Sequence, residues 1–66
     1  MREYTNSQVD YLISEYIHSK RDREILKLRF IDGLTYEQIS EQIDMSVRQV
    51  KNIIYREQDK IFKHML

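Results

Sequence analysis

The chain has 66 residues, which is room for one domain. It contains no cysteine, and its two histidines lie far apart without the spacing of metal ligands, so we expect no disulfide, no metal and no cofactor. No apolar run is long enough to span a bilayer and no signal peptide is evident, so we expect a cytoplasmic protein without a membrane partner. The formal net charge is zero, but segments 20–31 and 46–66 each carry five basic and two acidic side chains, whereas 32–45 carries only acids.

The first half of the chain is predicted to form two helices. Thr5 begins a capping-box pattern, and apolar residues then recur at helical spacing, which predicts a helix over 6–18. Ser19 can cap a second helix over 20–32, and Gly33 suits the left-handed residue that ends a helix.

The second half is predicted to form a short helix over 35–43 and a longer one over 46–64, joined by the break at Asp44 and Met45. Thr35 and Ser46 each begin a further capping-box pattern. The short helix has only about two turns and must be held by its neighbours. The residues best suited to the core are Ile25, Leu28, Phe30, Leu34, Tyr36, Ile39, Ile43, Val50 and Ile54.

This order of elements predicts an all-α, four-helix domain over residues 1–66, with a helix-turn-helix over 35–57. In such a motif the first helix braces the second, whose outer face can then enter a groove of double-stranded DNA. Short amphipathic helices with tight connections also describe a small helical bundle that does not bind DNA.

The stretch from Arg21 to Lys63 resembles region 4 of the sigma-70 family of bacterial RNA polymerase sigma factors. The residues that match the family pattern, in order, are Arg23, Glu24, Ile25, Leu28, Arg29, Phe30, Gly33, Leu34, Glu37, Ile39, Ser40, Ser46, Val50, Lys51 and Arg56. The resemblance implies a DNA-binding regulator of transcription that acts with RNA polymerase. LuxR-type regulators share parts of this pattern.

The chain departs from the family pattern at three points. Asp44 stands where the family often has Gly, and Gln49 replaces the usual Thr. Because we expect no further domain before the first helix, we interpret the chain as a standalone region-4-like protein, of the kind found among small phage and mobile-element regulators, or as an excised domain. The resemblance also implies that basic residues of the second helix pair with acids, and we expect an ion pair of Arg29 with Glu37 or Glu41.

The recognition helix is expected over 46–57, with its N-terminal turns in the major groove. Its outward residues by helical spacing are Val47, Arg48, Lys51, Asn52, Tyr55 and Arg56. The predicted DNA-binding set also includes Ser46 and Gln49 at the start of this helix, and Thr35, Tyr36 and Gln38 of the short helix.

These residue types favour different contacts. Arg48 can pair with guanine, and Gln49 or Asn52 with adenine, although the cap competes for Gln49. Lys51 and Arg56 are better suited to phosphates. Each of these side chains also has a simpler interpretation, as a solvated surface group.

Two alternatives to a DNA reader stay open. The neutral net charge and the acidic segment 32–45 favour a protein-interaction adaptor or anti-activator that binds RNA polymerase or another regulator. An enzyme is disfavoured, because the sequence contains no acid–base cluster, phosphate loop or nucleophile with an adjacent base. The C-terminal residues Ile61, Phe62, Met65 and Leu66 can pack on Tyr4 or Leu12, form the seam of a homodimer, or dock on polymerase.

Overall fold

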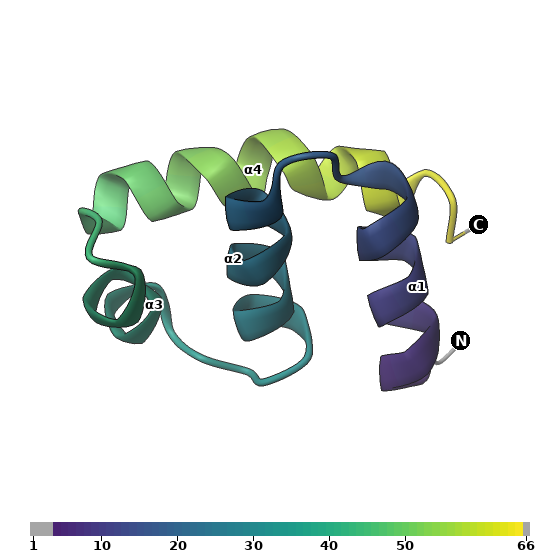
Figure 1. Ribbon diagram of the computed structural model, residues 1–66, viewed down its shortest axis with the longest axis horizontal. Helices are drawn as coiled ribbons and strands as arrows, with labels where there is room; N and C mark the ends of the chain where they lie inside the picture. Colours follow the sequence, from purple (N-terminus) through teal and green to yellow (C-terminus); the bar gives the residue numbers. More distant parts are fainter. Residues whose placement is uncertain (1–3, 66) are drawn as a thin grey trace.

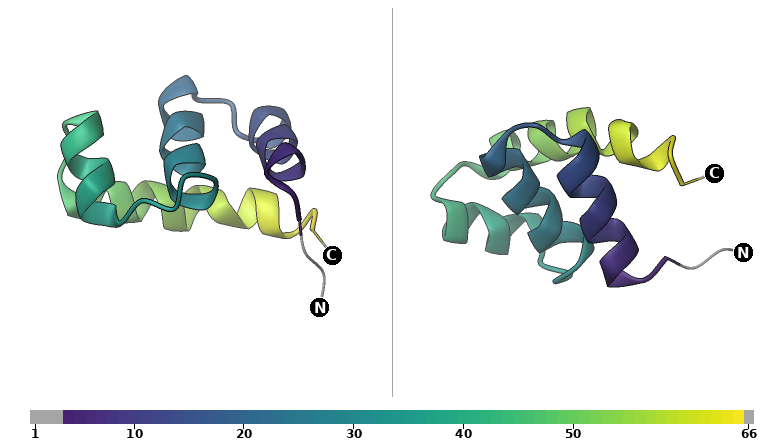
Figure 2. Two further views of the ribbon diagram at one scale, coloured as in Figure 1. Left: turned by 90° about the horizontal axis from the view of Figure 1, so that it is seen from below. Right: turned by 45° about the vertical axis from the view of Figure 1, so that its right-hand side comes forward.

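The computed structural model describes residues 4–65 and contains four helices that pack around one core (Figure 1). The helices are α1 (Asn6–Tyr16), α2 (Lys20–Phe30), α3 (Tyr36–Ile43) and α4 (Val47–Phe62). α2 and α4 each contact all of the other helices, whereas α1 and α3 lie at opposite ends of the molecule. α4 runs along one side of the other three (Figure 2, left), so its outer face is left uncovered by them. The predicted all-α, four-helix architecture is confirmed.

Side-chain caps begin every helix where the sequence predicts them. The capping boxes at Thr5, Thr35 and Ser46 are complete, with the side chain of each cap accepting from the backbone three residues on and the glutamine there accepting in return. Ser19 accepts from the backbone N–H of Asp22. These caps satisfy N–H groups that the first turn of a helix cannot pair internally.

Three helices end earlier than the apolar pattern predicts. α1 ends at Tyr16 rather than His18, because Ile17 adopts an extended backbone and turns its side chain fully into the core. α2 ends at Phe30 rather than residue 32, and the backbone N–H of Leu34 then donates to the carbonyl of Leu28. α4 ends at Phe62 rather than residue 64, and the last described residues after it form a turn.

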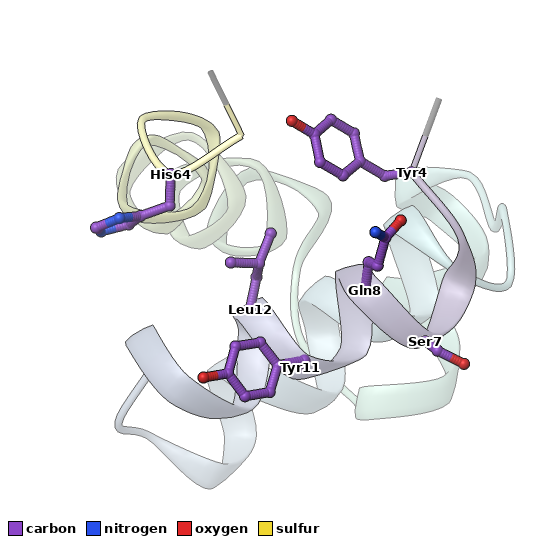
Figure 3. A pocket seen from close by; sticks show the side chains of 6 residues that line it. All are labelled: Tyr4, Ser7, Gln8, Tyr11, Leu12 and His64. Carbon is purple, nitrogen blue, oxygen red and sulfur yellow. The ribbon is translucent and has the colours of Figure 1, made fainter. Parts of the chain in front are cut away.

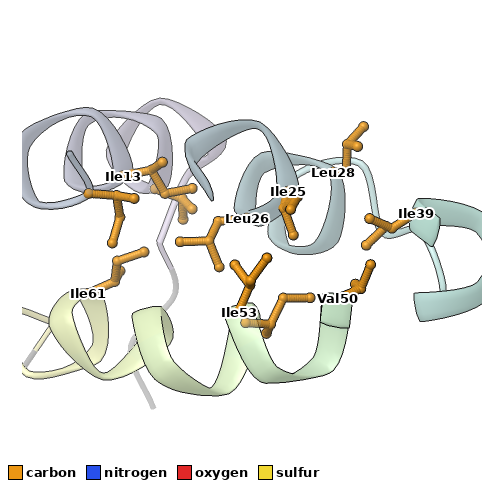
Figure 4. Close-up of a cluster of buried hydrophobic side chains, with 11 residues drawn as sticks. Ile13, Ile25, Leu26, Leu28, Ile39, Val50, Ile53 and Ile61 are labelled. Atoms are coloured by element: carbon orange, nitrogen blue, oxygen red, sulfur yellow. The ribbon is translucent and has the colours of Figure 1, made fainter. Parts of the chain in front are cut away.

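The core runs the length of the molecule between α4 and the other helices (Figure 4). Five of the predicted core residues are buried, namely Ile25, Leu28, Ile39, Val50 and Ile54, whereas Phe30, Leu34, Tyr36 and Ile43 are only partly buried against them. The remaining buried apolar residues are Val9, Ile13, Ile17, Leu26, Ile53 and Ile61. α1 therefore belongs to the same core as the helix-turn-helix.

The C-terminal residues cover the end of this core. Ile61 is buried and Met65 partly buried, while Phe62 is 41% exposed and packs edge-on against Phe30 with ring centroids 5.6 Å apart. Tyr4 and Leu12 are partly buried against the same core, as intramolecular packing predicts. Leu66 lies outside the described residues.

Gly33 and Asp44 have left-handed backbones, with φ of +74° and +63°. Gly33 follows α2, and Asp44 is the C-cap of α3 in the turn that leads to α4. Asp44, which stands where the family often has Gly, adopts this left-handed turn because Asp tolerates the region better than most residues.

Replacing Gly33 with Ala is expected to lower the free energy of unfolding by about 1 kcal/mol. A Cβ at this position would meet nothing within 4 Å, so the loss reflects backbone strain alone. Chemical denaturation of Gly33→Ala and Gly33→Asn measures the effect. Asn adopts the left-handed region more readily, so a loss as large in the Asn variant would contradict this explanation.

Candidate nucleic-acid interface

α3 and α4 meet at the turn around Asp44 and form the predicted helix-turn-helix. Ile39 is the buried residue of α3, and it faces the core alongside Val50 of α4. The apolar stripe of α4, which includes Val50, Ile53 and Ile54, is turned inward as expected. The opposite face of α4 is therefore free to meet a ligand.

The predicted DNA-binding residues lie mainly on that uncovered face. Those of α4 and its cap that are exposed are Ser46, Arg48, Gln49, Lys51, Asn52, Tyr55 and Arg56. Val47 is half-buried. In α3 and its cap, Thr35 and Gln38 are exposed and Tyr36 is half-buried. The exposed residues of α4 thus lie away from the apolar stripe that the core uses.

The capping boxes already occupy part of the polar set. The Oε1 atom of Gln49 accepts from the Ser46 backbone at 3.1 Å, and that of Gln38 accepts from the Thr35 backbone at 2.9 Å. An amide that pairs with adenine must use both its oxygen and its nitrogen. Gln49 therefore keeps only its NH₂ group free while the cap is formed.

Tyr36 stands at the start of α3, between two cations and a second aromatic ring. The Arg29 guanidinium lies 4.6 Å and the Lys51 ammonium 5.6 Å from the centre of its ring, and Tyr55 packs edge-on at 6.3 Å. Contacts of this kind attract a cation to the face of an aromatic ring. They join α2, α3 and α4 at one flank of the recognition helix.

The expected ion pair of Arg29 with Glu37 or Glu41 is corrected by the structure. Arg29 instead donates from Nη1 to the backbone carbonyl of Leu34 at 2.9 Å and packs over Tyr36. The carbonyl of Leu34 lies in the loop between Gly33 and α3, where it has no hydrogen bond of a helix. Arg29 therefore holds the α2–α3 connection in place, and both glutamates are exposed.

On the other flank of α4, two buried carboxylates face three cations. Asp22 is only 3% exposed and accepts from Arg56 at 3.2 Å and from Arg21 at 3.4 Å. Glu57 is 5% exposed, with the Lys60 ammonium at 2.8 Å. Arg56, predicted to bind phosphate, is thus also an ion-pair partner between α2 and α4.

Asp22 and Glu57 were missed as structural residues by the sequence analysis. Asp22 lies in the first turn of a helix, where the helix dipole favours any acid. The sequence pattern therefore does not indicate that its side chain is buried. The sequence does indicate burial of Glu57, because this residue falls at helical spacing with Ile53, Ile54 and Ile61 on the apolar stripe of α4. A carboxylate at such a position requires partners.

Asp22 is expected to make the stability of the protein depend on acid pH. Burial raises its pKa, but the charges of Arg21 and Arg56 and the hydrogen bond that Arg56 donates outweigh burial, so the pKa lies below its ordinary value of 3.8. The stability that Asp22 contributes is therefore complete above pH 3.8 and is lost as the pH falls through the lower pKa of the folded protein.

Acid titration of the free energy of unfolding measures this effect. Asp22→Asn should remove part of the decline that the unmodified protein shows below pH 3.8. Asp59→Asn, at an exposed position of α4, is the matched control and should leave the decline nearly unchanged. Parallel curves for the unmodified protein and Asp22→Asn would contradict the role given to Asp22.

The described residues contain a surface pocket far from this interface, at the end formed by α1 and the C-terminus (Figure 3). It is lined by Tyr4, Ser7, Gln8, Tyr11, Leu12 and His64. Within residues 4–65 no three histidine or acidic side chains come together as metal ligands. No helix in that range is long and apolar enough to cross a membrane.

The docked pair α3–α4, with a polar and basic outer face on its second helix, defines a helix-turn-helix domain. The family model described as Sigma-70, region 4 matches residues 19–57, which is more than half of the chain. The chain therefore belongs to this family of DNA-binding, non-enzymatic helix-turn-helix domains with roles in transcription. Searches of curated proteins and of solved structures gave no significant match.

Proposed function

We propose that the protein is a sequence-specific, DNA-binding transcription regulator that places the first turns of α4 in the major groove. The observation that carries the proposal is the outer face of α4, where Arg48, Lys51 and Asn52 are exposed on a helix whose opposite face is buried in the core. A helix of this width fits the major groove of B-form DNA. The family match supports the same reading.

In this proposal the predicted DNA-binding residues fall mainly into two groups. Arg48 and Asn52 read base edges, with Gln49 contributing through its amide nitrogen. Ser46, Lys51 and Arg56, together with Thr35, Tyr36 and Gln38 at the start of α3, contact the phosphate backbone. Val47 meets a thymine methyl group, and Tyr55 donates to a phosphate.

Selection from a randomised duplex library, followed by affinity measurements over a range of salt concentrations, tests this function. We expect a defined enriched sequence and an affinity that falls steeply as salt rises, because phosphate contacts release counterions. A palindromic sequence would indicate that the protein binds as a homodimer. The absence of both enrichment and salt-dependent binding would reject the proposal.

The second candidate function is an adaptor that binds RNA polymerase or another regulator without reading DNA. Asp32, Glu37, Glu41 and Asp44 favour it, because all four are exposed and segment 32–45, which contains them, carries no basic residue. Co-purification with RNA polymerase that survives Arg48→Ala and Lys51→Ala would favour the adaptor. Loss of that association in the same variants would argue against it.

A further inference from the structure

The two flanks of the recognition helix are built differently. Lys51 lies on the flank that contacts Tyr36, whereas Arg56 lies on the flank that contacts Asp22 of α2. These two residues are five positions apart, which separates them by about 140° around the helix axis. The arc between them on the outer side contains Arg48 and Asn52, the proposed base readers.

The flank at Asp22 carries cations that are already held in position. Arg21, Arg56 and Lys60 have side chains that are 57%, 61% and 47% exposed, yet each lies within 3.4 Å of a carboxylate that is almost fully buried. Asp22 and Glu57 supply those carboxylates from two different helices. Three cations on two carboxylates leave this cluster positive, and the guanidinium groups keep N–H donors that face solvent.

We propose that Asp22 and Glu57 are positioning residues that fix Arg56, together with Arg21 and Lys60, as a clamp for the backbone phosphates of one DNA strand. Lys51 and Tyr36 contact the other strand across the same major groove. This inference rests on the proposed DNA-binding function and adds which residues hold each strand.

The geometry of a groove supports this division. An α-helix with its side chains is about as wide as the major groove, so its two flanks face the two backbones that border the groove. Arginine binds phosphate with two parallel hydrogen bonds when its guanidinium is correctly oriented. An arginine that an ion pair already orients loses less conformational freedom on binding.

The decisive test is Asp22→Asn, for which positioning and simple charge predict opposite results. Removal of a negative charge beside DNA strengthens binding if charge alone matters. If Asp22 positions Arg56, the dissociation constant of Asp22→Asn instead rises about tenfold, as expected for loss of one charged hydrogen bond. Asp59→Asn removes an exposed carboxylate from the same helix and is expected to tighten binding.

Fluorescence anisotropy on the enriched duplex measures the dissociation constant of each variant. Repeating it at several salt concentrations also gives the slope of log affinity against log salt. Circular dichroism establishes that each variant is folded at the temperature used. Binding by Asp22→Asn as tight as that of Asp59→Asn would overturn the clamp.

Arg56→Gln gives a test that does not depend on the stability of Asp22→Asn. It should lower the slope of log affinity against log salt by about 0.9, the value for one phosphate contact. Lys63→Gln, which removes an exposed charge after the end of α4, is the matched control and should leave the slope nearly unchanged. Equal slopes for the two variants would overturn the proposal. If the unmodified protein shows no salt-dependent binding to any duplex, the proposed function fails and the clamp fails with it.

Discussion

Replacing Ile39 with Ala is expected to leave a large part of the protein unfolded at room temperature. Ile39 is fully buried and is the buried residue of α3, a helix of eight residues that is too short to be stable alone. Truncation of a buried isoleucine costs about 2–5 kcal/mol, and a domain this small has a stability near the lower end of the range of about 5–15 kcal/mol. Ile39→Ala should therefore disrupt the helix-turn-helix although it changes none of the predicted DNA-binding residues.

Thermal and urea unfolding followed by circular dichroism measure this loss. The midpoint temperature should fall by roughly 8–40 °C, given a loss of about 2–5 kcal/mol and about 4–8 °C for each kcal/mol in a domain of this size. Gln42→Ala, at an exposed position on the same helix, is the control and should unfold close to the unmodified protein. A similar midpoint for Ile39→Ala and Gln42→Ala would show that α3 is not held by this contact.

The fold was predictable because its local and tertiary signals agree. The caps Thr5, Ser19, Thr35 and Ser46 each begin a helix in the structure, and Gly33 adopts the left-handed conformation that its position predicts. Such signals act within a few residues of the chain, so the sequence alone contains them. The ends of the helices were less predictable, because the departure of Ile17 from α1 is decided by where the core lies.

The candidate site was predictable only in part. Helical spacing correctly placed Arg48, Lys51 and Asn52 on the outer face of α4. It did not give the partners of Arg29 or Arg56, since those depend on which groups α2 brings close to α3 and α4. An exposed ion pair contributes little to the free energy of unfolding. A loop carbonyl or a buried carboxylate that lacks a partner lowers that free energy much more. Arg29 and Arg56 therefore bind the loop carbonyl and the buried carboxylate rather than exposed acids.

Replacing Arg48 with Ala is expected to change which DNA sequence the protein selects, more than it changes binding to DNA in general. Arg48 is exposed in the first turn of α4, next to Ser46 and Gln49, which are tied to each other by the cap. A bidentate contact from arginine to guanine contributes about 1–3 kcal/mol of discrimination, or roughly 5- to 150-fold between the correct and the wrong base. Selection from a randomised duplex library should therefore lose its preference at one position of the enriched sequence.

Lys51→Gln provides the contrast that makes the Arg48→Ala result specific. Lys51 lies on the Tyr36 flank, where a phosphate contact is proposed, so its loss should weaken binding to all duplexes alike and reduce the salt slope by about 0.9. Arg48→Ala should instead lower the ratio between affinities for the enriched duplex and for one substituted at the affected position. If Arg48→Ala keeps the full preference, Arg48 is a surface charge and base reading must rest on Asn52 and Gln49. That outcome would keep α4 in the groove but move the centre of recognition toward the C-terminus by less than one turn of the helix.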